Sequence, residues 1–301
     1  MMRICSLLPS TTEIVCSLGL RDSLVGITHE CDYPPGINKV PVVTESLIDH
    51  TDSTSIEIDR HISAAIHSGS GIYKIKTNVL KTSSPDLILT QELCEVCAVS
   101  YSMVEASVKE LKGQQTVLSF EPIKLEGIFE SIEKIGTFTN SEDISKPLLK
   151  DLRSRVSNVQ KKVTDAQDMP HVLGLEWLDP PFIGGHWVPE MIESAGGIDV
   201  IGLREEPSRE IEWQDAIKSS PEIVVLMVCG FDLNKTIAEF RSARTGVFWD
   251  NFNGSIYAVD GSSYFSRPGP RIVDGLEILA EIFHPALFPR KHSEDDWIKI
   301  T

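Results

Sequence analysis

The chain has 301 residues, which is enough for one large domain or two of average size. Its 41% hydrophobic and 24% charged residues are close to the averages for globular proteins, which excludes a disordered or collagen-like chain. The 28 basic and 44 acidic residues give a formal net charge of -16, which repels nucleic-acid backbones and anionic lipid surfaces. We therefore expect neither nucleic acid nor a lipid surface as a partner.

The hydropathy pattern and the N-terminus bear on location. No run of about 18 apolar residues occurs, so we expect no insertion into a membrane. A buried strand is predicted already at residues 4–8, with no secretion signal before it. The sequence as written predicts a cytoplasmic protein, whereas a trimmed N-terminus would allow a periplasmic or extracellular one.

Apolar β-rich runs alternate with segments of helical period, which predicts an α/β fold of parallel sheets covered by helices. The strands and helices predicted in the first part are 4–8, 24–28, 86–90 and 116–120, and 11–18 and 99–111. Ser10 and Glu13 have the spacing of a capping box at the first helix. Residues 34–72 lack a clear period, and we expect an irregular excursion there.

A helical segment is predicted to link two lobes. Apolar residues recur at helical spacing over 125–135, and a second stretch runs from residue 141 to 163 with Pro147 expected in its first turn. The strands and helices predicted after it are 171–177, 222–228 and 255–259, and 187–194, 233–243 and 270–283. The domains are then an N-terminal α/β lobe, a long rigid linking helix and a C-terminal α/β lobe, at residues 1–122, 123–168 and 169–301.

Ligands of open α/β sheets bind at the carboxyl ends of the strands, because the loops there vary while the sheet holds them in place. Aromatic and polar side chains follow several predicted strands of this chain. The candidate ligand-binding residues are His29, Cys31, Tyr33, Glu92, Cys94, Cys97, Trp177, Phe182, His186, Trp187, Phe231, Tyr264 and Arg267. Such rings suit a large, flat, mostly apolar ligand, although single rings could instead close the end of their own lobe.

Four of these residues have the chemistry of a metal site. His29, Cys31, Cys94 and Cys97 could supply one imidazole and three thiolates to a zinc ion. Their spacing matches no standard zinc module, and free cysteine is commonly a small buried hydrophobe, so we favour packing or ligand contact over zinc. A cytoplasmic Cys/His metal-binding or redox enzyme built on the four residues stays as an alternative.

The chain has no motif of a serine hydrolase or of a nucleotide-binding enzyme. The chain lacks a GxSxG elbow, a phosphate-binding GxxxxGK[ST] loop and a complete dinucleotide fingerprint. The carboxylates of Glu176 and Asp179 are followed by two prolines, which favours a rigid turn over acid–base catalysis.

Several motifs match a known family. They are Ser6-Leu7-Leu8-Pro9-Ser10-Thr11-Thr12-Glu13, Pro85-Asp86-Leu87-Ile88-Leu89 and Ala195-Gly196-Gly197, with the stretches 29–34, 94–97, 176–187 and 264–271. Together they resemble the cobalamin-binding branch of the substrate-binding proteins of ABC importers for cobalamin and iron chelates, which are class III periplasmic-binding-protein-like. The resemblance covers nearly the whole chain. It implies two α/β lobes bridged by a long helix, with the ligand held between them and no enzymatic activity.

The resemblance implies that cobalamin or a related corrinoid binds in the cleft between the lobes, for an ABC importer or for intracellular corrinoid handling. His186 or His29 could replace an axial ligand of cobalt. The alternative is an iron-siderophore or haem binder, to which the expected cleft loops offer mainly Arg267 and Arg271 as cations. We expect a monomer.

Docking to a permease is a further implication of the resemblance. In importer-docking relatives, one acidic residue on each lobe pairs with arginines of the permease. Glu190 occupies the matching place on the second lobe, whereas Asn78 occupies it on the first. An amide cannot supply the charged half of such a pair, which counts against docking on that side.

Overall fold

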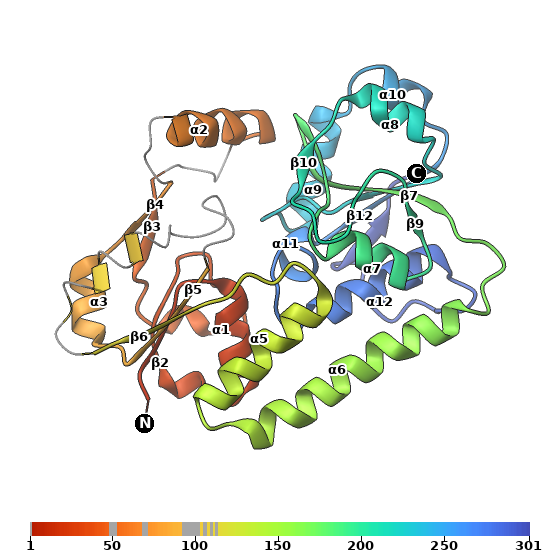
Figure 1. Cartoon of the computed structure of the whole chain (residues 1–301). Helices are drawn as coiled ribbons and strands as arrows, with labels where there is room; N and C mark the ends of the chain where they lie inside the picture. Colours follow the sequence, from red (N-terminus) through yellow and green to blue (C-terminus); the bar gives the residue numbers. More distant parts are fainter. Residues whose placement is uncertain are drawn as a thin grey trace. The chain divides into compact units, whose positions relative to one another are not determined.

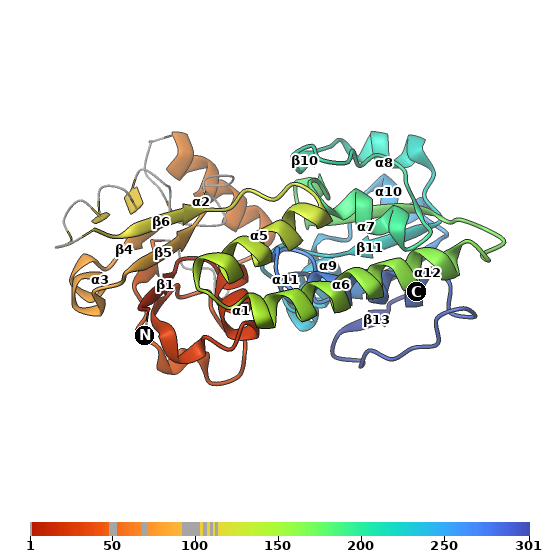
Figure 2. The ribbon, with the colours of Figure 1, turned by 60° about the horizontal axis from the view of Figure 1, so that its bottom comes forward.

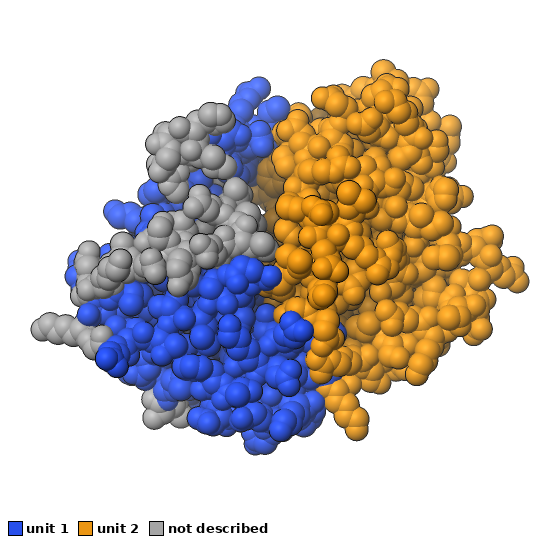
Figure 3. Space-filling view, in the orientation of Figure 1, with its two compact units in different colours: residues 1–121, 129–149 blue, residues 122–128, 150–301 orange. Residues whose placement is uncertain are grey.

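The computed structural model describes residues 2–47, 53–67, 72–91, 103–104, 107–108, 111 and 114–301. The chain divides into two compact units, unit 1 (residues 1–121 and 129–149) and unit 2 (residues 122–128 and 150–301), which Figure 3 distinguishes by colour. Each unit contains its own sheet and helices, which confirms the predicted α/β class.

Unit 1 contains a four-stranded parallel sheet. Its strands, in spatial order, are β2 (Leu24–Ile27), β1 (Ile4–Ser6), β5 (Leu87–Thr90) and β6 (Thr116–Ser119). The central strands are buried along their whole length, as expected of a parallel sheet covered on both faces. A separate antiparallel pair, β3 (Thr44–Ser46) and β4 (Tyr73–Ile75), lies in the segment between β2 and β5.

The first helix of unit 1 begins earlier than predicted. Helix α1 spans Pro9–Ser17, and Leu8 at its N-cap makes no side-chain capping bond, so the capping box predicted at Ser10 is wrong. The reason is Pro9, whose fixed φ and missing N–H suit the first helical position, so the helix begins before Ser10.

The segment 34–72 is not irregular throughout, because it contains α2 (Ser55–His67) as well as β3. The side chain of Glu57 accepts hydrogen bonds from the N–H and hydroxyl of Thr54, each at 2.9 Å. Thr54 and Glu57 have capping-box spacing, and that signal could have located α2 in the sequence. The remaining short helices of this unit are η1 (Arg21–Ser23), η2 (Ile37–Lys39) and α3 (Thr77–Ser83). The helix predicted at 99–111 falls mostly outside the described residues.

Two helices form the segment that was expected to link the lobes: α5 (Leu125–Phe138) and α6 (Glu142–Val163). A Cβ on Gly136 would lie 2.5 Å from Ser145 Oγ, so glycine permits the close approach of the two helices. Pro147 lies beyond the first turn of α6, because the helix begins at Glu142. Within unit 2, α6 runs beside α12 (Ile272–Phe283), as Figure 2 shows, and Arg155 of α6 bonds Glu277 of α12.

Unit 2 is built on a mixed sheet. Its central strands β7 (His171–Leu178), β11 (Ile223–Leu226) and β12 (Ser255–Val259) are parallel, as predicted, and β9 (Ile198–Asp199) adds to them. Three antiparallel strands that the sequence analysis did not predict extend the edges. They are β8 (Pro181–Ile183), β10 (Arg209–Glu210) and β13 (Trp297–Lys299).

Helices cover the sheet of unit 2 (Figure 1). They are α7 (Val188–Ser194), α8 (Trp213–Ser219), α9 (Leu233–Ala243), α10 (Val247–Asn251), α11 (Gly261–Tyr264) and α12. Helix α12 is buried over most of its length and packs on α7. Among the described residues, we find no helix with the length and apolar content needed to cross a bilayer.

Candidate ligand-binding site

The candidate residues of unit 2 lie at one edge of its sheet. Strands β7, β11 and β12 are parallel and in register, so their carboxyl ends meet at the same edge. Trp177 lies near the end of β7, Phe231 follows β11, and Tyr264 ends the short helix after β12. The structure therefore brings together three aromatic residues that are far apart in the sequence.

Trp177 is the centre of this aromatic edge. Its ring lies 5.3 Å from the ring of Phe231, centroid to centroid, and Phe182 is its partner in the β7–β8 register. Trp177 and Phe182 are partly exposed, whereas Phe231 is buried, with Lys235 Nζ 4.1 Å from its ring centroid. The indole N–H of Trp177 is buried and has no hydrogen-bond partner among the described residues.

The loop after β8 is held by backbone contacts. A Cβ on Gly185 would lie 2.2 Å from the backbone nitrogen of Ser208, so only glycine fits there. The N–H of Gly185 donates to Ser208 Oγ at 3.2 Å, and this hydroxyl donates to Glu176 Oε2 at 2.6 Å. The next residue, His186, has a φ of 51° and donates its N–H to the carbonyl of Glu206 at 2.6 Å. His186 is thereby fixed in a left-handed conformation that few side chains adopt.

The imidazole of His186 is suited to donate a hydrogen bond. Burial lowers its pKa from the usual 6.5, so the ring is neutral at pH 7. Its Nδ1 is buried without a hydrogen-bond partner among the described residues, so the tautomer that keeps the proton on Nε2 is favoured. A metal bond through Nε2 would move that proton to Nδ1, where no acceptor is found in the described part of the chain.

Other predicted residues of unit 2 are buried. Trp187 donates its indole N–H to the carbonyl of Phe265 at 2.8 Å, which satisfies its one polar atom. Trp187, Phe231 and Arg267 are each less than a tenth exposed, since their exposed fractions are 7%, 3% and 9%. For these three, burial favours the alternative of packing at the end of the lobe, and their contact with a ligand stays a prediction.

Tyr264 is partly exposed and hydrogen-bonded within the unit. Its hydroxyl donates to Asp296 Oδ1 at 2.6 Å, and the guanidinium of Arg271 lies 5.7 Å from its ring centroid. Asp296 precedes β13, a strand that the sequence analysis missed, so this partner was missed too.

In unit 1, His29 and Cys31 follow β2 and bond to neighbouring side chains. Nδ1 of His29 is 2.7 Å from Thr44 Oγ1, and its Nε2 is 3.0 Å from a carboxylate oxygen of Glu30. Cys31 is buried, with its Sγ 3.1 Å from Thr12 Oγ1. Tyr33 is exposed, with 41% of its surface open. Sequence reasoning missed Thr44, which β3 brings to His29.

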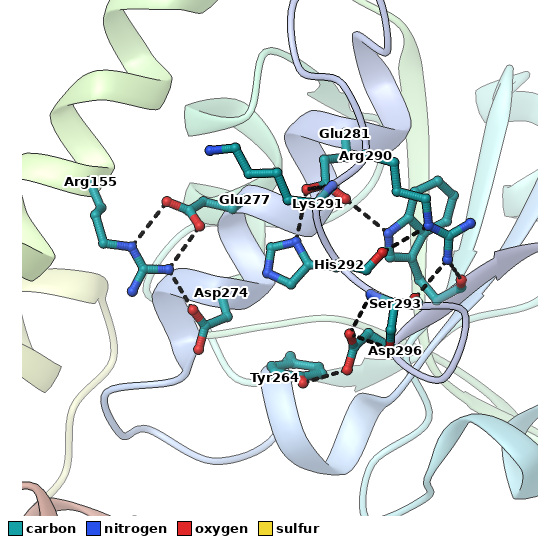
Figure 4. Close-up of polar contacts among 11 residues, drawn as sticks. Arg155, Tyr264, Asp274, Glu277, Glu281, Arg290, Lys291, His292, Ser293 and Asp296 are labelled. Carbon is teal, nitrogen blue, oxygen red and sulfur yellow. Dashed lines mark hydrogen bonds and ion pairs between the residues drawn. The ribbon is translucent and has the colours of Figure 1, made fainter.

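The predicted zinc site of His29, Cys31, Cys94 and Cys97 is not tested, because Cys94 and Cys97 lie outside the described residues. Glu92, which was predicted as a ligand contact, lies outside them too. Among the described residues, Asp274, Glu277 and His292 have ligand atoms close enough for one ion. Arg155 already binds both of those carboxylates (Figure 4), so a cation is present there.

Burial, and then the nearby Cys31, raise the pKa of Cys5 to about 12, which leaves that thiol protonated and inert.

The two residues discussed for permease docking differ in their surroundings. Glu190 Oε2 accepts a hydrogen bond from the backbone N–H of Leu125 at 2.8 Å, at the first residue of α5. Asn78 is exposed and lines a groove of about 590 Å³ in unit 1.

Both that groove and a larger one in unit 2, of about 1230 Å³, lie at the amino ends of the strands. Arg3 lines the first, and His171 and Ser255 line the second, at the starts of β1, β7 and β12. The candidate residues lie at the opposite edge, so neither groove belongs to the candidate site.

Comparison with known proteins assigns the chain to a family. A model of the periplasmic binding protein family matches residues 4–245. The chain is 26% identical over 298 residues to an uncharacterized ABC transporter substrate-binding lipoprotein, YvrC, of Bacillus subtilis, covering 95% of this chain and 81% of that protein. It is 23% identical over 292 residues to a vitamin B12-binding protein of Vibrio cholerae, covering 91% of this chain and 86% of that protein.

A solved structure has the same fold. The periplasmic heme-binding protein of Pseudomonas aeruginosa superposes with a TM-score of 0.71 at 16% identity, covering 95% of this chain and 93% of that one. The resemblance stated from the sequence motifs is thus confirmed. The chain belongs to the periplasmic binding protein family, whose members bind solutes for transport and are not enzymes.

Proposed function

We propose that this chain binds cobalamin or a related corrinoid, as the substrate-binding component of an ABC importer. The observation that carries the proposal is the aromatic edge of unit 2, where Trp177 and Phe182 are partly exposed and the buried ring of Phe231 packs against Trp177. Aromatic rings that their neighbours hold in place lose little side-chain entropy when a flat macrocycle stacks on them, and the buried contact area favours binding.

The polar groups beside these rings fit the rim of a corrin. A corrin ring carries neutral side-chain amides, each of which both donates and accepts hydrogen bonds. His186 offers a donor through Nε2, and Trp177 offers an indole N–H that has no partner in the described residues. Such groups fix the orientation of a ligand that the apolar rings hold by contact area.

Haem is the second candidate ligand. The heme-binding protein of Pseudomonas aeruginosa shares the fold. Arg267 and Arg271 lie in the loop after α11, and arginine is a good partner for the carboxylates of haem. We rank haem below a corrinoid because Arg267 is buried and the carboxylate of Asp260 already interacts with both arginines.

A spectral titration tests the proposal. The purified chain is titrated with aquocobalamin and, separately, with hemin, and binding is followed by quenching of tryptophan fluorescence and by calorimetry. We expect aquocobalamin to bind with a Kd below about 10 μM and more tightly than hemin. Tighter binding of hemin would replace the first candidate by the second, and binding of neither would overturn both.

A matched pair of variants locates the site. Trp177→Phe removes the indole N–H and part of the ring, and we expect it to weaken corrinoid binding about fivefold or more. Trp213→Phe alters a ring that packs on Phe248 and Trp249 in a separate aromatic cluster. This control is expected to keep wild-type affinity.

A further inference from the structure

The hydrogen bond between Tyr264 and Asp296 has a fixed direction. Tyr264 donates its hydroxyl proton to Asp296 Oδ1 at 2.6 Å, as Figure 4 shows. The other carboxylate oxygen, Oδ2, accepts from the N–H and the hydroxyl of Ser293 at 2.7 and 2.8 Å. Every one of these neighbours is a donor, so Asp296 acts as an ionised carboxylate that only accepts.

The protonation of both groups supports this direction. Burial alone would raise the pKa of Asp296, but the hydrogen bonds from Tyr264 and Ser293 outweigh it and hold that pKa below the usual 3.8. Burial, and then the bond to Asp296, raise the pKa of the Tyr264 phenol. A neutral phenol has a single proton. Since Asp296 takes it, the phenolic oxygen can only accept a hydrogen bond from any other group.

The backbone keeps the pair in place. Strand β13 pairs antiparallel with β12, with Val259 opposite Trp297, and the N–H of Asp260 donates to the carbonyl of Asp296 at 2.9 Å. Asp296 therefore lies at the carboxyl edge of the sheet, where Tyr264 also lies. The C-terminal strand delivers the carboxylate to the candidate site.

Two carboxylates and one cation act on Tyr264. The cation is Arg271, whose guanidinium lies 5.7 Å from the ring centroid, and the carboxylates are Asp296 and Asp260. Asp260 also interacts electrostatically with Arg271 and Arg267. The surroundings of the phenol therefore give no net attraction for a ligand with carboxylates on its rim.

We propose that Asp296 makes Tyr264 an obligate hydrogen-bond acceptor and thereby selects a ligand rim of amide N–H groups over a rim of carboxylates. The inference rests on the proposed function and names the chemistry of the preferred ligand. A corrin amide donates to the phenolic oxygen, whereas an ionised carboxylate in the same place would set two acceptors against each other. Asp296 is a positioning residue, because it acts on the ligand through Tyr264.

The test compares two ligands that differ in one group. Cyanocobalamin carries side-chain amides, and in its monocarboxylic acid derivatives one amide has been hydrolysed to a carboxylate. We expect the chain to bind cyanocobalamin at least about tenfold more tightly than one of these derivatives. Calorimetric titration at pH 7 gives both affinities.

The variant Asp296→Asn is expected to reverse the direction of the bond. Its carbonyl oxygen would stay with the two donors of Ser293, so its NH2 group would face Tyr264 and donate to the phenolic oxygen. The tyrosine proton is then released toward the ligand, and the preference for the amide should fall at least about fivefold. Asp295→Asn removes an equal charge from the exposed neighbouring position and should keep the wild-type preference.

A double variant separates positioning from mere loss of structure. In Tyr264→Phe the hydroxyl is absent, so adding Asp296→Asn should no longer change the preference. A preference that still changes in the Tyr264→Phe background would mean that Asp296 acts otherwise, and would overturn the inference. Equal binding of both ligands by the wild-type chain would also overturn it while leaving the proposed function intact. Failure of the wild-type chain to bind either corrinoid would overturn both.

Discussion

Glu190 bonds to Leu125 across 65 positions of sequence, with its Oε2 2.8 Å from the backbone nitrogen that begins α5. A carboxylate at a helix N-terminus satisfies a backbone N–H that has no partner within the helix and interacts favourably with the helix dipole. The residue that the resemblance assigns to permease docking thus also caps a helix of its own chain.

Substitutions at Glu190 separate these two roles. Glu190→Gln keeps an oxygen that can accept from Leu125, so we expect the free energy of unfolding to fall by no more than about 0.5 kcal/mol. Glu190→Ala leaves the N–H without its acceptor and should cost about 1–2 kcal/mol. Urea denaturation of both variants measures the difference. Equal losses for the two variants would show that the hydrogen bond from Leu125 contributes nothing.

If the charge of Glu190 also pairs with a permease, the glutamine variant has a second phenotype. Ligand uptake into cells should fall, while the affinity of the purified Glu190→Gln chain for its ligand stays at the wild-type value. Unchanged uptake would remove Glu190 from docking and leave only its role at α5.

Much of the central fold could be predicted from the sequence, because buried parallel strands are continuous apolar runs. The strands at 4–8 and 255–259 are of this kind, and both were found within two residues of the observed ends. The edge strands were missed for the opposite reason. Strand β10 is the exposed pair Arg209–Glu210, which carries no apolar signal.

The candidate site could be predicted only in part. Trp177 and Tyr264 were identified because large rings at the ends of strands are unusual, although the structure places Trp177 in β7 and Tyr264 in α11 rather than in loops. Their partners come from distant positions. Asp296 is 32 residues from Tyr264, and Phe231 reaches Trp177 only through the pairing of β7 with β11. No local pattern in the sequence encodes such pairings.

The pH dependence of His186 distinguishes a hydrogen-bond donor from an axial metal ligand. Its folded pKa is lowered below 6.5 by burial, so stability from the neutral ring is present above about pH 6.5 and is lost as the pH falls. Ligand binding through Nε2–H should leave the visible bands of aquocobalamin unshifted at pH 7.5. A new band that disappears in His186→Asn would instead assign His186 to cobalt. Asparagine is the suitable replacement, because it tolerates the positive φ of this position.

Among the described residues, we expect the ion pairs of Arg155 with Glu277 and Asp274 to be the strongest between α6 and α12. It bonds Glu277 through two nitrogens at 3.0 and 2.8 Å and reaches Asp274 at 2.5 Å, and all three side chains are half-buried. Arg155→Met leaves two partly buried carboxylates without their counter-ion and should cost about 2–3 kcal/mol of unfolding free energy. Arg153, which lies on the same helix as Arg155, makes an exposed pair with Glu126 of α5, and Arg153→Met should cost less than about 1 kcal/mol.

The same pair gives a pH test. Burial alone would raise the pKa of Glu277, but Arg155 outweighs it and holds that pKa below the usual 4.5. The stability from this pair is therefore present above about pH 4.5 and is lost as the pH falls through the lowered pKa. The difference in stability between wild type and Arg155→Met, measured by urea denaturation, should shrink between about pH 5 and pH 3. A constant difference over that range would contradict the assignment.

Gly185 offers a test of how the loop supports His186. A Cβ at this position would meet the backbone of Ser208 at 2.2 Å and of Pro207 at 2.5 Å, and backbone cannot move aside as a flexible side chain can. We expect Gly185→Ala to cost about 2–4 kcal/mol of stability. Because the displaced loop also carries His186, the variant should lose ligand affinity at temperatures where it is still folded. Gly127→Ala is the matched control. Its Cβ would meet Pro122, which precedes α5, at an ordinary 3.4 Å, and alanine inside α5 favours the helix by about 0.5–1 kcal/mol. Wild-type stability of Gly185→Ala would mean that the loop can move away from Ser208, and His186 would then lack the fixed position from which its donor role is argued.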